Sequence, residues 1–76
     1  MKTLDSLKIG QTATIQSFTD DFLSLKLIEM GCLPGEHVKL CKIAPMGDPI
    51  SIEIAGYELS LRKKEASTIV INHISK

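Results

Sequence analysis

Hydrophobic and polar residues alternate along much of this chain with the two-residue period of β-strands. The pattern is clearest in residues 50–54, where isoleucine occupies every second position, and it resumes in residues 57–61 after a short reversal at Ala55-Gly56. Because successive side chains of a strand point to opposite faces, these two segments predict a hairpin with one buried face.

Three further segments predict strands, at residues 12–18, 36–44 and 68–74. The second of them loses its phase near Leu40-Cys41, so either both of its faces are partly covered or a β-bulge bends it there. The polar segment 62–67 is too short for a full helix and predicts a single helical turn. Five short strands joined by close turns predict a mainly β fold, a small and strongly bent sheet or barrel.

Residues 21–30 have helical spacing, and short polar side chains that can cap a helix start, such as Asp20, come just before them. One helix face would dock on the core, and it carries Leu23, Leu27 and Met30. Other sectors of the helix are also apolar and carry Phe22, Leu25 and Ile28. Either the sheet and the N-terminal arm cover these residues, or they form an exposed patch that grips a partner.

The helix is expected to stop at Gly31, because glycine adopts the left-handed conformation of a helix C-terminus at little cost. Pro34 cannot continue a helix, and Pro34-Gly35 has the chemistry of a type II turn. The chain can therefore reverse directly into the next strand. We expect this joint to be rigid.

The loop of residues 44–49 is rich in turn formers, namely Gly47, Asp48 and Pro49. It has two interpretations. In the first it only shapes the turn, with Asp48 accepting a hydrogen bond from nearby backbone. In the second it presents Met46 as a flexible apolar tip for docking.

Composition narrows the function classes. The chain of 76 residues holds nine basic and nine acidic residues, so its formal net charge is +0. Nucleic acids and acidic membranes attract proteins mainly through positive charge on the protein, so neither is an expected partner.

No apolar run approaches the roughly 20 residues that span a bilayer. We expect a cytoplasmic protein that meets a membrane only through a partner. The length fits a single domain, residues 1–76, with an N-terminal arm that packs through Leu4, Leu7 and Ile9.

Candidate chemistry is sparse. The chain has no phosphate-binding glycine loop, no HExxH motif and no triad spacing, so we expect neither an enzyme nor a cofactor. Nitrogen and sulfur ligands for zinc could come from Cys32, His37, Cys41 and His73. The first three are five and four positions apart, which is poor spacing for a zinc site. We therefore expect no metal site, and the two cysteines are expected to be reduced thiols.

Three segments resemble, in order and spacing, the three signatures of the FeoA family: residues 27–35, 44–50 and 61–66. The resemblance implies an SH3-like β-barrel with helical insertions that is the cytosolic accessory partner of the FeoB ferrous-iron transporter. The same fold occurs as the C-terminal domain of DtxR-type repressors, so a regulatory metal- or ligand-sensing domain is the alternative. Cys32 and Lys26 depart from the residues that the family more often has there.

The leading hypothesis is an adaptor for ferrous iron uptake. Its helix and the 44–49 loop would form a preformed surface for the cytosolic part of a FeoB-type transporter. The residues expected to contact the partner are Leu25, Lys26, Ile28, Glu29 and Met46. One short helix face and one loop make a small interface, which suits a transient contact.

Overall fold

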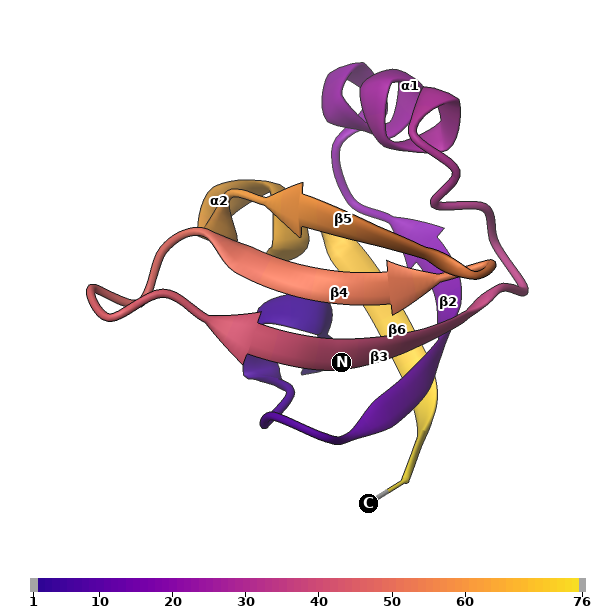
Figure 1. Cartoon of the computed structure of the whole chain (residues 1–76). Coiled ribbons are helices and arrows are strands. Elements are labelled where there is room, and N and C mark those ends of the chain that lie inside the picture. Colours follow the sequence, from indigo (N-terminus) through magenta and orange to yellow (C-terminus); the bar gives the residue numbers. More distant parts are fainter. Residues whose placement is uncertain (1, 76) are drawn as a thin grey trace.

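The computed structural model describes residues 2–75, which form one six-stranded antiparallel sheet with short helices beside it (Figure 1). In chain order the elements are β1 (Lys2–Thr3), the 3-10 turn η1 (Leu4–Ser6), β2 (Thr12–Phe18), α1 (Asp21–Glu29), β3 (His37–Ile43), β4 (Ile50–Ile54), β5 (Tyr57–Leu61), α2 (Lys63–Ala66) and β6 (Ile69–Ser75). Met1 and Lys76, the ends of the predicted domain, lie outside the described residues. No helix among residues 2–75 is long and apolar enough to cross a membrane.

The sheet order is β1-β6-β2-β3-β4-β5, so the chain's last strand lies between its first two. The predicted mainly β fold is confirmed, with one strand more than the five expected. The additional strand, β1, pairs Lys2 with Ile71 and Thr3 with Val70 and is too short to show a period. In the pairing of the described residues β1 and β5 are the two edges, so the sheet is open and the predicted closure into a barrel is not confirmed.

Three register shifts help to bend the sheet. In the β3–β4 pairing, Leu40 faces Ile52 and Lys42 faces Ser51, which leaves Cys41 as the extra residue of a bulge at the predicted place. The β2–β6 pairing shifts twice, and His73 lies in one of these irregular stretches with φ 52°. Since each bulge bends its strand and increases the local twist, a sheet of short strands can wrap around one small core.

The core consists of aliphatic side chains from every long strand and from the N-terminal arm. Its fully buried larger members include Leu4, Ile15, Leu40, Ile52, Ile54, Leu61 and Ile69. Ile9 was expected there but is 61% exposed, because it lies in the turn closed by the bond from Gln11 N to Lys8 O. Tyr57 was expected on the buried face of the hairpin and is also exposed, since it directly follows the tight Ala55-Gly56 turn at the end of the sheet.

Local chemistry sets both ends of α1. The Asp20 side chain accepts a hydrogen bond of 2.9 Å from Leu23 N and caps the first turn. At the other end Gly31 has φ 104°, and two bonds, Gly31 N to Ile28 O and Cys32 N to Leu27 O, form a Schellman motif. Gly35 then has φ 94°, as a type II turn requires. α1 and β3 are therefore joined by a short segment with defined turns.

Candidate partner-binding surface

The outward side of α1 is apolar and faces solvent. Phe22 is 84% exposed, Leu25 65% and Ile28 39%, whereas Leu27 on the inward side is fully buried. The sheet and the arm leave most of Phe22 and Leu25, and more than a third of Ile28, exposed. Of the two interpretations of the surplus apolar residues, the structure favours the exposed patch. We call this surface, with the exposed Asp21 and Glu29 at its two ends, the outer face of α1.

Few contacts hold α1 to the rest of the molecule. Leu27 is its one fully buried residue, and Met30 packs against the same core. The Schellman motif places the buried Cys32 beside Leu27, where the usual apolar contact of such a cap forms. Figure 1 shows α1 standing at one end of the molecule, away from the sheet strands.

A buried carboxylate gives α1 a second attachment. Glu65, in α2, is 6% exposed, and one of its oxygens accepts a hydrogen bond of 2.7 Å from Lys26 Nζ. Its other oxygen accepts a bond of 2.8 Å from Arg62 N, which satisfies a free donor at the start of α2. Lys26 therefore ties α1 to α2, although 62% of its side chain is exposed.

The sequence interpretation did not identify Glu65. A glutamate three residues after the N-cap position is half of a capping box, and this signal was available in Arg62 to Glu65. The bond to Lys26 had no such signal, because 39 positions separate the two residues.

The Lys26–Glu65 contact predicts acid sensitivity. The bond from Lys26, and then the bond from Arg62 N, lower the pKa of Glu65 below its usual value, about 4.3. A carboxyl whose pKa is lower in the folded state stabilises the fold above its unfolded pKa, and that contribution disappears as pH falls through the folded pKa. We expect the melting temperature of Glu65→Gln to lie below that of the wild type at pH 7. The difference between the two melting temperatures should become smaller below about pH 4. Equal differences at pH 7 and at pH 3 would contradict this assignment.

The 44–49 loop is a tight turn with an apolar tip. Gly47 N donates a bond of 2.7 Å to Ala44 O, and Met46 is 91% exposed. The Asp48 side chain accepts a bond of 2.9 Å, but from Lys63 N at the start of α2 and not from the loop itself. The loop therefore has an exposed tip and a base that is attached to α2.

The helix and the loop do not form one continuous surface. In Figure 1, α1 lies at the upper right and the loop between β3 and β4 extends to the far left, with α2 between them. α2 is connected to both, to α1 through Lys26–Glu65 and to the loop through Asp48–Lys63. The predicted contact residues Leu25, Ile28 and Glu29 lie together on α1, and Met46 lies apart from them.

The candidate zinc ligands have separate environments. Cys32 is fully buried, and burial followed by the charge of Glu65 raises the pKa of its thiol. His37 is exposed, and its Nδ1 lies 3.1 Å from Thr14 Oγ1. Cys41 is in the β3 bulge and His73 is in β6. Residues 2–75 contain no group of three or more histidine, cysteine or acidic side chains that could hold a metal ion.

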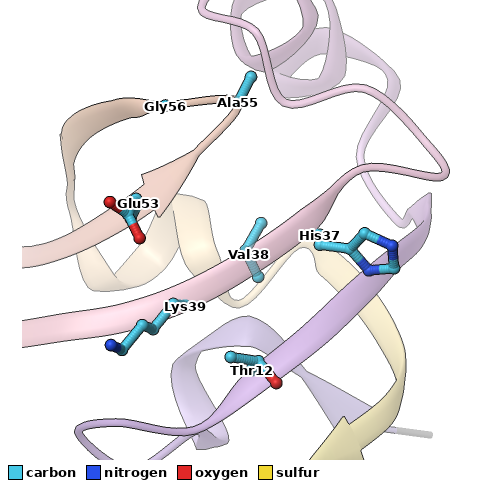
Figure 2. Close-up of a pocket in the computed structure, with 7 residues that line it drawn as sticks. All are labelled: Thr12, His37, Val38, Lys39, Glu53, Ala55 and Gly56. Atoms are coloured by element: carbon cyan, nitrogen blue, oxygen red, sulfur yellow. The ribbon is translucent and has the colours of Figure 1, made fainter.

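An open hollow of about 390 Å³ lies across β2, β3 and the β4–β5 turn (Figure 2). Its lining residues are Thr12, His37, Val38, Lys39, Glu53, Ala55 and Gly56. Figure 2 shows the His37 and Lys39 side chains extending in different directions from β3, so they do not converge on one point. The hollow was not anticipated from the sequence, and its side chains form no recognisable catalytic arrangement.

Comparison with known proteins identifies the family. The family model of the FeoA domain matches residues 2–73 of this chain. A protein of Porphyromonas gingivalis, described as an Fe(2+) transport protein A/Fe(2+) transporter FeoB fusion protein, is 34% identical over 50 residues. The match covers 66% of this chain and 6% of the fusion protein, so the chain corresponds to a small part of that relative.

Solved structures agree with the family match. The iron(II) transport protein A of Clostridium thermocellum is 37% identical with a TM-score of 0.86, covering 92% of this chain and 44% of that one. Stenotrophomonas maltophilia FeoA was solved with zinc and is described as a procaryotic SH3 domain protein. It is 27% identical with a TM-score of 0.83, and the match covers 95% of this chain and 91% of that one.

The fold is also that of a repressor domain. A manganese-dependent transcriptional repressor is 17% identical with a TM-score of 0.82, covering 92% of this chain and 40% of the repressor. At this identity the likeness concerns the fold alone. Because the family model covers nearly the whole chain and relatives of the same description match in sequence and structure, this chain belongs to the FeoA domain family.

Proposed function

We propose that this chain is a cytoplasmic accessory protein of ferrous iron uptake that binds the cytosolic part of a FeoB-type transporter through the outer face of α1. The observation that carries the proposal is the exposed apolar row Phe22, Leu25 and Ile28 on a helix capped at both ends. The fusion relative supports the choice of partner, since joining two modules in one chain raises their effective concentration for each other.

The fold proposed for this adaptor is an SH3-like barrel. The strongly bent sheet and the likeness to the Stenotrophomonas maltophilia protein support it. The pairing of residues 2–75 is compatible with a partly open barrel whose edges are β1 and β5. α1, inserted between β2 and β3, is free to project from such a barrel.

The proposed contact is small. α1 has nine residues and is therefore roughly 13 Å long, so its outer face is well below the area of a standard stable interface. Met46 would be a second contact for a partner large enough to reach both surfaces. Lys26 lies at the border of the outer face, where it positions α1 through Glu65 and still exposes most of its side chain. Such a contact suits regulation by the transporter's nucleotide state or assembly.

Replacing Ile28 by glutamate should weaken binding to the cytosolic part of the transporter at least tenfold, which corresponds to about 1.4 kcal/mol. The reason is that a charge in the apolar row must be desolvated in the complex. The melting temperature should change little, because Ile28 is already 39% exposed. Binding is measured by titration calorimetry with the purified cytosolic part.

The matched control is Ile9→Glu, the same chemical change at an exposed isoleucine. It lies in the segment between η1 and β2, at the end of the molecule away from α1 (Figure 1). Ile9→Glu should bind like the wild type. Equal losses for both variants, or unfolding of the Ile28 variant, would contradict the proposed surface.

The regulatory-sensor alternative has less support. It depends on a likeness to a repressor domain that concerns only the fold. The candidate ligands that could have favoured it are dispersed over β3, β6 and the segment after α1. We therefore propose the transport function.

A further inference from the structure

The two charged residues within the outer face of α1, Asp21 and Glu29, are both acidic. At about 100° per residue, Asp21 and Glu29 point into the same sector as Phe22, Leu25 and Ile28, and both are exposed. The single basic residue of α1, Lys26, lies at the border of this sector, about 40° from Phe22 and about 100° from Leu25. Its ammonium group is paired with Glu65, on the side of α2.

The fold accounts for Asp21 only through the helix dipole, which favours a carboxylate in the first turn, and it does not account for Glu29. Among residues 2–75 the ion pairs are Lys26–Glu65 and Lys42–Glu58, so neither Asp21 nor Glu29 has a basic partner there. Glu29 is the last residue of α1, where the negative end of the helix dipole makes a carboxylate unfavourable. A cation supplied by a binding partner would offset this cost.

The charge also limits what can cover the outer face. Phosphate groups of nucleic acids and anionic lipid headgroups would be repelled by it. Two copies of this chain meeting through the same face would place carboxylates against carboxylates without a base between them. An apolar row between carboxylates instead complements a protein surface that is apolar at its centre and basic at its rim.

We propose that the outer face of α1 docks into an apolar groove of a protein partner, and that lysine or arginine residues at the rim of the groove pair with Asp21 and Glu29. This inference deepens the proposed function, and it rests on that function where the partner is the cytosolic part of a FeoB-type transporter. It adds the chemistry of the complementary surface.

The test uses Glu29→Lys, because a lysine in the last turn of a helix is favourable for the dipole and should not weaken folding. Affinity for the purified cytosolic part of the transporter is measured by titration at low and at high salt, alongside a thermal melt. We expect about tenfold weaker binding at low salt and a smaller difference at high salt, since exposed charges are screened. The control Glu53→Lys makes the same charge change on β4 and should stay within about twofold of wild type.

Three results would overturn the inference in different ways. If the wild-type chain binds and Glu29→Lys binds equally tightly or more tightly, the complementary rim is not basic. The proposed function would then still stand. No binding of the wild-type chain would overturn the proposed function and this inference together. A salt-independent loss would also contradict it, because pairing at an exposed rim depends on ionic strength.

Discussion

Replacing Leu27 by alanine is expected to lower the free energy of unfolding by about 3 kcal/mol, the typical cost of a buried leucine-to-alanine change. Leu27 is fully buried and is the one residue of α1 inside the core. For a domain of this size each kcal/mol shifts the melting temperature by roughly 4–8 °C, so the midpoint should fall by at least about 12 °C. Calorimetry or urea unfolding measures both quantities.

Leu25→Ala is the matched control on the same helix. Leu25 is 65% exposed, so its truncation should change the free energy of unfolding by less than about 0.5 kcal/mol. The same variant should bind the transporter's cytosolic part more weakly, because it removes part of the outer face. Equal destabilisation by the two changes would show that α1 is covered on both sides.

Replacing Gly31 by valine is expected to cost about 2 kcal/mol of folding free energy. Gly31 has φ 104°, a region that a β-branched side chain adopts only with strain. A Cβ placed there would meet no atom within 4 Å, so the loss comes from the backbone and not from a clash. Thermal unfolding of the wild type and the variant measures the difference.

Gly31→Asn provides the comparison, because asparagine tolerates the left-handed region better than other residues with a side chain. Gly31→Asn should lower the free energy of unfolding clearly less than Gly31→Val does. An unchanged melting temperature for Gly31→Val would mean that α1 ends in another way. Because this cap sets the angle at which α1 leaves the core, we also expect the valine variant to bind more weakly than its loss of stability explains.

Most elements could be predicted from the sequence because their signals are local. Alternation identified β4 and β5, and the glycine and proline pair marked the end of α1. Loss of phase had two interpretations near Leu40-Cys41, and the pairing shows that the bulge is the correct one. The errors occur where a residue's environment depends on the path of the chain. Ile9 has the composition of a core residue, but a turn directs it outward.

The candidate surface was only partly predictable. Spacing showed that α1 has more apolar residues than it needs to pack on the core. It did not show which of them the rest of the molecule would cover. The separation of Met46 from α1 depends on the strand order, which no local pattern encodes. Glu65 illustrates the same limit, because its bond to Lys26 needs two distant segments to meet.

The sequence alone therefore determined the mainly β class, the position of the helix, its ends and the family, since these depend on spacing, caps and short motifs. Tertiary structure decided that Phe22, Leu25 and Ile28 face solvent, that Lys26 is paired with Glu65, and that the outer face of α1 is left acidic. The physical reason is that burial and charge pairing depend on which segments pack together. A residue's own neighbours in sequence do not specify those contacts.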